Sequence, residues 1–175
     1  AKQIFKWIHQ KQATDFSAMT DQPKALLAQF AQNCTLAVPT IRRRQQSKDG
    51  TVKYLLQLAD GNCIETVLMQ YHHGNTVCVS SQVGCRMGCA FCASTIGGLK
   101  RNLTAGEIMA QVTSVLRHIK DEQSIPLASD MERIGHIVIM GTGEPFDNFD
   151  NVKRFIELAN SPKGLGISMK NITVS

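Results

Sequence analysis

The stretch that decides the fold covers residues 76 to 92 and reads Thr76-Val-Cys-Val-Ser80-Ser-Gln-Val-Gly-Cys85-Arg-Met-Gly-Cys89-Ala-Phe-Cys92. Its opening residues favour a β-strand, because β-branched side chains are enriched in strands. Three thiols follow close together in the loop after that strand. Soft thiolates favour iron–sulfur chemistry, and three local ligands leave one iron of a cubane open to a small molecule. Zinc is the alternative, although zinc sites usually add a second cysteine pair or histidines to complete four ligands.

The sequence after this loop alternates between helices and strands. Thr104 followed by Glu107 forms a capping-box pattern at the start of a helix. After a polar loop at residues 121–130, Ile137-Val-Ile-Met140 predicts a short buried strand, and Ile172-Thr-Val174 predicts another one after an intervening helix. Strands separated by helices pair in parallel through right-handed crossovers. This part of the chain therefore predicts a parallel α/β sheet that is incomplete at residue 175.

The sequence before the loop predicts two further units. Residues 1–38 show the apolar periodicity of short helices. From about residue 40 the pairs Asp49-Gly50, Asp60-Gly61 and Gly74-Asn75 separate strand-like runs at hairpin spacing. We therefore predict an α/β fold in three parts. They are an N-terminal helical accessory module at 1–38, antiparallel β hairpins at 39–75 and a cluster-binding β/α unit at 76–175.

A second motif, Gly141-Thr-Gly-Glu-Pro145, ends the strand that follows the cysteine loop. By itself it reads as a strand-ending turn whose acid faces solvent. Parallel α/β sheets, however, place their sites at the carboxyl ends of the strands, where this motif and the cysteine loop would meet. There the Glu144 carboxylate is suited to bind the ammonium group of a small molecule.

The composition is that of a globular chain, with 43% hydrophobic and 19% charged residues. It lacks an apolar run of the ~20 residues that a membrane helix needs, so we expect a cytoplasmic protein without a membrane partner. The six cysteines are then unlikely to form a structural disulfide framework. The net charge of +5, with a run at Arg42-Arg43-Arg44 and a pair at Lys100-Arg101, permits nucleic-acid binding but equally describes solvated faces.

The cysteine spacing resembles the signature of the radical S-adenosylmethionine (SAM) superfamily, and the match extends further. The segment from Cys78 to Cys92, followed by Lys100-Arg-Asn-Leu103, Gly143-Glu-Pro145 and Ile172-Thr-Val-Ser175, is similar to the RlmN family. The resemblance spans essentially the whole chain. It implies that residues 76–175 form the N-terminal half of a radical SAM (β/α) barrel, preceded by the helical module and a short antiparallel β meander.

The resemblance also implies roles for individual residues. The ligands of a 4Fe–4S cluster are matched by Cys85, Cys89 and Cys92, and the SAM-binding positions by Gly143, Glu144 and Ser175. Glu65 matches the acid that accepts the adenine proton. Cys78 matches the thiol that resolves a covalent RNA adduct through a transient disulfide. Without the resemblance, Glu65 would be read as a solvated acid and Cys78 as a small core residue.

The family's activity is methylation of the C2 carbon of an adenosine in 23S ribosomal RNA and in tRNA. The resemblance therefore implies RNA substrates, an external electron donor, a 4Fe–4S cluster and SAM as cofactors, and a monomeric enzyme. The family's methyl-carrying cysteine lies near the C-terminus, well beyond Ser175, and neither Cys34 nor Cys63 matches it. We therefore expect this chain to be a fragment that does not methylate RNA alone.

Three alternatives remain open at this point. The related family that methylates adenine C8 in ribosomal RNA shares the cluster and both auxiliary cysteines, although Pro145 after the glutamate favours C2 methylation. A zinc-stabilised RNA-binding module would use its basic runs for phosphate contacts and would not be an enzyme. A radical SAM enzyme with a small-molecule substrate is the third.

Overall fold

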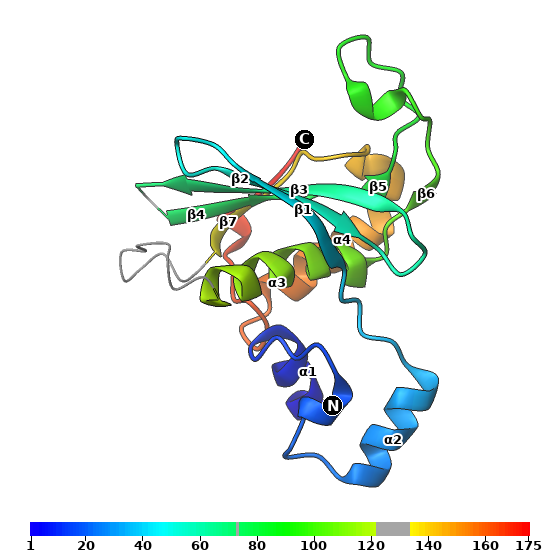
Figure 1. The fold of residues 1–175 in the computed structure, drawn as a ribbon, viewed down its shortest axis with the longest axis vertical. Coiled ribbons are helices and arrows are strands. Elements are labelled where there is room, and N and C mark those ends of the chain that lie inside the picture. The colour runs from blue at the N-terminus through cyan, green and yellow to red at the C-terminus, as the bar shows by residue number, and fades with distance from the viewer. Residues whose placement is uncertain (73, 122–133) are drawn as a thin grey trace.

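One six-stranded sheet organises the chain, in the order β1-β2-β3-β4-β7-β8 (Figure 1). The structure is a computed structural model, and it describes residues 1–72, 74–121 and 134–175. A separate two-stranded ladder joins β5 to β6. The strands are β1 (Thr40–Gln46), β2 (Val52–Gln57), β3 (Cys63–Tyr71), β4 (Gly74–Cys78), β5 (Gln82–Val83), β6 (Arg101–Asn102), β7 (Ile134–Ile139) and β8 (Ile172–Val174). The helices are α1 (Lys2–His9), α2 (Lys24–Asn33), α3 (Ala105–Asp121) and α4 (Phe149–Asn160), with 3₁₀ turns η1 (Phe16–Ala18), η2 (Ala93–Thr95), η3 (Pro145–Asn148) and η4 (Met169–Asn171).

Strand β4 is where the sheet changes direction. Strands β1 to β4 pair antiparallel, as the turn pairs predicted. Strands β4, β7 and β8 pair in parallel, as expected for strands joined by helical crossovers. The predicted α/β fold with an antiparallel part followed by a parallel part is confirmed. The predicted boundary between residues 75 and 76 falls inside β4, so one sheet runs through it, and the division into domains stays a prediction.

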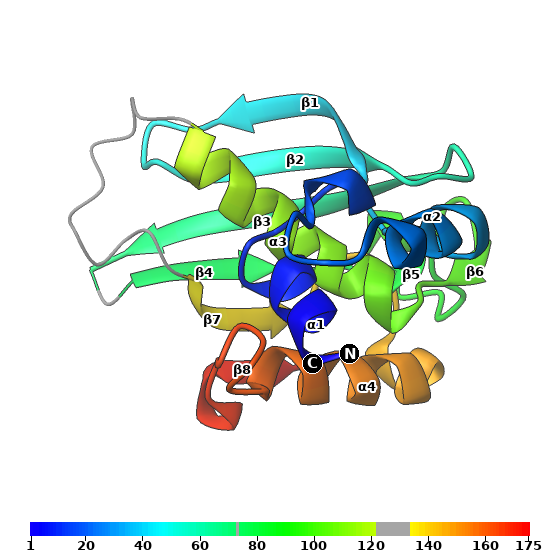
Figure 2. The same ribbon diagram turned by 90° about the horizontal axis from the view of Figure 1, so that it is seen from below.

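Helix α3 covers one face of the sheet (Figure 2). Side chains alternate along β2 and β3, so that Tyr54 and Leu68 are fully buried on this face. They form one apolar core with Ile108 and Val112 of α3. Burial of each such side chain contributes about 1.5–3 kcal/mol to folding. The core therefore fixes which face of each strand turns away from the helix.

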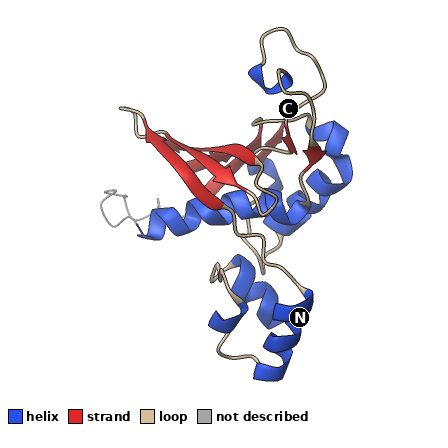
Figure 3. Ribbon diagram, turned by 45° about the vertical axis from the view of Figure 1, so that its right-hand side comes forward, coloured by secondary structure: helices blue, strands red, loops and turns tan. Residues whose placement is uncertain are grey.

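The opposite face of the sheet carries no α-helix of the described chain (Figure 3). The loop that contains η2 rises on this side, while α1 and α2 lie beyond α3 on the other (Figures 1 and 3). Side chains on this face, such as Glu65 and Leu55, are only partly covered. This uncovered face carries Glu65, one of the residues that the resemblance singled out.

Local signals account for the element boundaries. The predicted capping box is confirmed, because the Thr104 N–H donates to Glu107 Oε2 at 2.9 Å and the Glu107 N–H donates to Thr104 Oγ1 at 3.2 Å. The predicted strand at 137–140 begins earlier, at Ile134. From residue 122 on, the predicted polar loop lies outside the described residues. Among the described residues, no helix has the length and apolarity needed to cross a membrane.

Candidate functional site

The cysteine loop begins and ends at a narrow neck. Strands β5 and β6 pair across it, and the Lys100 N–H donates to the Val83 carbonyl at 2.8 Å. Gly84 has a φ of +75°, and a Cβ at this position would lie 1.9 Å from the Gly98 carbonyl oxygen. Both the backbone conformation and the space therefore require glycine at residue 84. The neck holds the two ends of the loop together whatever the loop binds.

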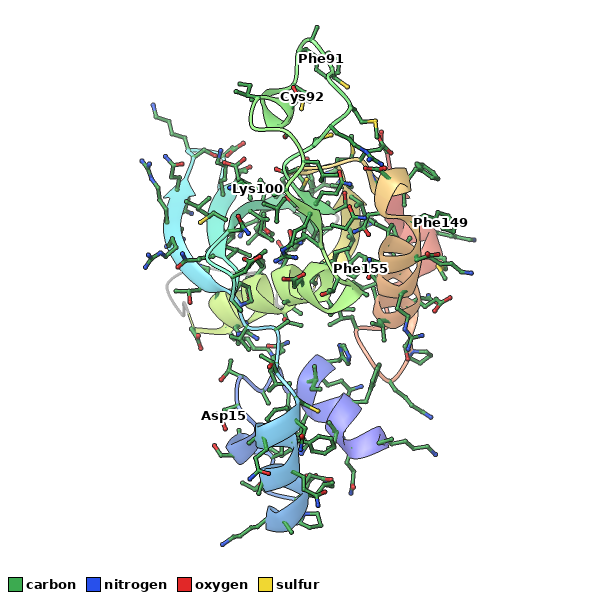
Figure 4. The ribbon with its side chains drawn as sticks, turned by 90° about the vertical axis from the view of Figure 1, so that its right-hand side faces the viewer. Asp15, Phe91, Cys92, Lys100, Phe149 and Phe155 are labelled. Atoms are coloured by element: carbon green, nitrogen blue, oxygen red, sulfur yellow. The ribbon has the colours of Figure 1, made fainter. Side chains whose placement is uncertain are left out.

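The three loop thiols differ in their surroundings. Cys85, next to the neck, is buried, whereas Cys89 is exposed and Cys92 is half-buried. Figure 4 shows Cys92 and Phe91 on the part of the loop that projects from the fold, and Phe91 is 93% exposed. Hydrogen bonds from Ser94 lower the pKa of the Cys92 thiol, which favours its thiolate form. All three cysteines are free thiols.

The thiols share one loop without forming a ready-made metal site. Among residues 1–72, 74–121 and 134–175, no group of three or more His, Cys, Asp or Glu side chains is placed to hold a metal ion. The donor set still fits an iron–sulfur cluster, because it consists of three free thiols on one loop. The outer residues Phe91 and Ile96 are both exposed, so their side chains are not packed in the core. Metal binding commonly completes such a site by ordering its ligands.

The Gly141–Glu144 turn lies directly against the segment that leads into the cysteine loop. The Ser81 and Gln82 N–H groups both donate to the Thr142 carbonyl, at 2.9 and 3.1 Å. Gly143 has a φ of +110°, and a Cβ there would lie 2.6 Å from Gln82 Cβ. The structure therefore brings the two motifs side by side at the carboxyl ends of β4 and β7, with glycine allowing the close approach.

Glu144 is half-buried at the end of this turn. Its backbone N–H donates to Gln82 Oε1 at 2.8 Å, and its Oε1 accepts from the Phe146 N–H at 3.0 Å. The side chain thus caps η3 and does not simply extend into solvent. Ser175 is exposed and follows β8 directly, so it lies at the carboxyl end of the neighbouring strand.

Glu65 and Cys78 lie on the uncovered face of the sheet. Cys78 pairs with Val67, which is two residues from Glu65 on the same strand, so the two side chains point to the same side. The Glu65 carboxylate forms an ion pair with Lys53 Nζ at 2.6 Å. It also borders a hollow of about 240 Å³ that includes Arg43. Burial raises the pKa of the Cys78 thiol, and a backbone hydrogen bond with Met140 opposes this only partly.

A buried polar network behind the motifs was not predicted from the sequence. Gln111 of α3 is fully buried, and its Oε1 accepts from the Ser80 N–H and from Thr66 Oγ1, both at 2.8 Å. Its Nε2 donates to the Ser80 carbonyl at 2.8 Å. The available signal was a glutamine next to Val112 on the apolar side of a helix. Gln111 therefore connects the core helix to the start of the segment that carries the thiols.

Asn148 extends this network to the neck of the loop. Its Nδ2 donates to the Ser81 and Leu103 carbonyls, both at 2.8 Å. Because these two carbonyls lie before β5 and after β6, one buried amide joins both sides of the neck.

Comparison with known proteins agrees with the resemblance to the RlmN family that the sequence motifs indicated. Residues 1–36 match the family described as the ribosomal RNA large subunit methyltransferase N-terminal domain. The whole chain is 50% identical to a probable dual-specificity RNA methyltransferase RlmN of Geobacillus kaustophilus and covers 46% of that protein. It is 52% identical to the corresponding protein of Lachnoclostridium phytofermentans, again covering 46% of it.

A solved structure extends the comparison to the fold. A radical SAM methyltransferase from Sphaerobacter thermophilus superposes with a TM-score of 0.86 at 42% identity, over 99% of this chain and 49% of that one. The chain thus spans about half the length of the relatives it matches. Over that half, the chain is similar in sequence to RlmN proteins and in fold to a radical SAM methyltransferase.

Proposed function

We propose that this chain is the cofactor-binding half of a radical SAM enzyme that methylates the C2 carbon of an adenosine in 23S ribosomal RNA and in tRNA. One observation carries the proposal. The Ser81 and Gln82 N–H groups bond to the Thr142 carbonyl, so the cysteine loop and the Glu144 turn begin at the same point. A thiolate-bound cluster and a group that binds an ammonium are thereby available to the same small molecule.

In this proposal, three residues hold the cluster and three others hold SAM. Cys85, Cys89 and Cys92 bind the 4Fe–4S cluster. When bound, the cluster supplies the electron that cleaves SAM and starts radical chemistry. SAM is contacted by Gly143, Glu144 and Ser175. The Glu144 carboxylate binds the ammonium group of SAM.

The uncovered face of the sheet supplies the proton and thiol chemistry. An adenine C2 carbon has neither an acidic proton nor a nucleophilic lone pair, so simple polar methyl transfer fails. Glu65 accepts the proton that the ring carbon loses. Cys78 forms a disulfide with the cysteine that carries the methyl carbon, and that cysteine lies in the part of the relatives that this chain does not span. As the sulfur–carbon bond breaks, the product carbon takes the electron pair and a proton.

RNA is the substrate class that the comparisons and the charge favour. The relatives from Geobacillus kaustophilus and Lachnoclostridium phytofermentans are both named as probable dual-specificity RNA methyltransferases. The net charge is +5, and Arg43 borders the same hollow as Glu65. Phosphate groups of RNA would meet this cationic side chain close to the proposed proton acceptor. We further propose an external electron donor, a monomeric state and a cytoplasmic location for the enzyme.

Anaerobic reconstitution of the 175-residue chain with iron and sulfide tests the cofactor part of the proposal. We expect brown protein with absorbance near ~400 nm and iron and sulfide in equal amounts. Replacement of Cys85, Cys89 or Cys92 by alanine should abolish this absorbance. The matched control is Cys34→Ala, which removes an exposed free thiol elsewhere in the chain. Stoichiometric zinc without sulfide would instead support the zinc-stabilised module.

Two measurements test the reaction itself. The enzyme encoded by the whole natural reading frame should yield adenosine methylated at C2, as mapped by mass spectrometry. Methylation at C8 would assign the activity of the related family instead. The 175-residue chain, reconstituted alone, should yield no methylated RNA, and product from it would refute the requirement for a further cysteine.

A further inference from the structure

One carboxylate, that of Asp147, bridges the two motifs. Asp147 lies in η3, directly after the Glu144 turn, and its side chain is 11% exposed. Its Oδ2 accepts a hydrogen bond from Gln82 Nε2 at 2.9 Å, and its Oδ1 pairs with the Arg86 guanidinium. Both donors belong to the segment that carries the thiols. Arg86 directly follows Cys85.

Gln82 makes this bridge part of a closed set of contacts. Its Oε1 accepts the Glu144 N–H at 2.8 Å, while its Nε2 donates to Asn102 Oδ1 at 2.7 Å as well as to Asp147. The Asp147 N–H in turn donates to the Glu144 carbonyl at 3.1 Å. Hydrogen bonds arranged in such a network strengthen one another, and loss of the Asp147 carboxylate would remove an acceptor from both Gln82 and Arg86.

The thiol loop beyond Arg86 is held differently. Within residues 89–98 the backbone hydrogen bonds stay inside the loop, as from the Cys92 N–H to the Cys89 carbonyl at 3.1 Å. The side chains of Phe91 and Ile96 are 93% and 87% exposed. Beyond the neck, the Asp147 contact therefore adds a side-chain link between the early part of the loop and η3.

We propose that Asp147 is a positioning residue that holds the first thiol, Cys85, at a fixed distance from the Glu144 turn. Its negative charge is what allows it to accept from two donors at once. Hydrogen bonds from Arg86 and Gln82 lower the pKa of Asp147, so it is ionised at neutral pH. The purpose of this positioning, alignment of the cluster with SAM, rests on the proposed function, whereas the coupling between the two segments does not.

Hydrogen exchange on the metal-free 175-residue chain tests the coupling. Asp147→Asn retains the shape of the side chain but turns one oxygen into a donor that faces Gln82 or Arg86. We expect amides of residues 81–86 and 144–147 to exchange about tenfold faster in this variant, as loss of one charge-assisted hydrogen bond implies. The matched control is Asp150→Asn, the same substitution at an exposed residue of α4, and its exchange should equal that of the wild type.

A second variant keeps the test valid if Asp147→Asn unfolds. Arg86→Met changes a side chain that is 64% exposed, so the fold should persist. It should accelerate exchange in the same peptides, though less than Asp147→Asn because exposed ion pairs are weak. The double variant should match Asp147→Asn alone. Unchanged exchange at residues 81–86 in both variants, or acceleration that extends equally to α3, would overturn the proposal.

Iron release separates this proposal from the proposed function. In the reconstituted chain, Asp147→Asn should lose iron to a chelator several-fold faster than Asp150→Asn, while both start with the same iron content. If the wild-type chain binds no iron but the exchange result holds, the proposed function fails and the coupling stands. If the chain binds iron and Asp147→Asn releases it at the control rate, the positioning role fails and the proposed function stands.

Discussion

At the scale of single residues, the uncovered face of the sheet holds two ionisable groups, Glu65 and Cys78, that differ in their exposure to solvent. The Glu65 carboxylate is half-exposed and forms an ion pair with Lys53. The Cys78 thiol is half-buried, and burial disfavours its thiolate form. The sequence located both residues only through a family resemblance, because nothing local distinguishes an acid or a thiol in a strand.

The Lys53–Glu65 ion pair should contribute little to stability. Both side chains are about half exposed, and solvent screens such pairs, so a double-mutant cycle with Lys53→Met and Glu65→Gln should give a coupling of about 0.2–1 kcal/mol. Urea unfolding of the four variants measures it. A coupling above about 2 kcal/mol would mean that the pair stabilises the fold more than an exposed ion pair does.

The Cys78 thiol should react slowly at neutral pH. Its pKa lies above the ordinary value, so at any pH below that pKa a smaller fraction of it is thiolate than for an ordinary thiol. Alkylation by iodoacetamide, followed by mass spectrometry, should modify the exposed Cys34 first. The Cys78 rate should still be rising at a pH where the rate of free cysteine in solution has levelled. Equal rates and equal pH profiles would contradict the account.

At the scale of elements, local patterns predicted more than tertiary contacts did. The Thr104–Glu107 capping box and strand β8 follow from short-range rules and are found as predicted. The two-residue ladder of β5 and β6 was missed, because it has no periodicity to detect. The role of Gln111 was missed as well, since the partners of a buried amide lie far away in sequence.

Gly84 should tolerate no side chain, unlike a second glycine of the same loop. Gly84→Ala forces a Cβ against the Gly98 carbonyl at a positive φ, so the unfolding free energy should fall by about 1–3 kcal/mol. Gly97→Ala is the control, because a Cβ there meets no atom within 4 Å. Denaturant unfolding of both variants measures the difference. Equal stabilities would show that the neck is not as tight as the structure has it.

Gln111 should matter for stability more than its hydrophobic surroundings suggest. Gln111→Leu leaves Ser80 and Thr66 groups without partners in the core, and the cost should be about 2–4 kcal/mol. Gln29→Leu, at an exposed position of α2, should change stability by less than about 0.5 kcal/mol. The comparison uses urea unfolding followed by circular dichroism. A neutral Gln111→Leu would mean that the network is dispensable.

At the scale of the whole molecule, the sequence predicted the order of the parts and the meeting of two motifs at the carboxyl ends of parallel strands. It did not predict that β4 joins the antiparallel and parallel strands into one sheet. It also did not predict the spread of the thiols, since spacing describes which ligands are near in sequence and not how a loop arranges them before metal binds. That arrangement depends on the bound group as well as on the chain.

The central claim is that three thiolates hold a cluster in which one iron has no protein ligand. Mössbauer spectroscopy of the anaerobically reconstituted, iron-labelled chain tests it most directly. The account predicts a cubane in which one iron in four differs from the rest and alone responds when a small ligand is added. Four equivalent irons that ignore added ligand, or a chain that takes up zinc and refuses iron, would contradict it.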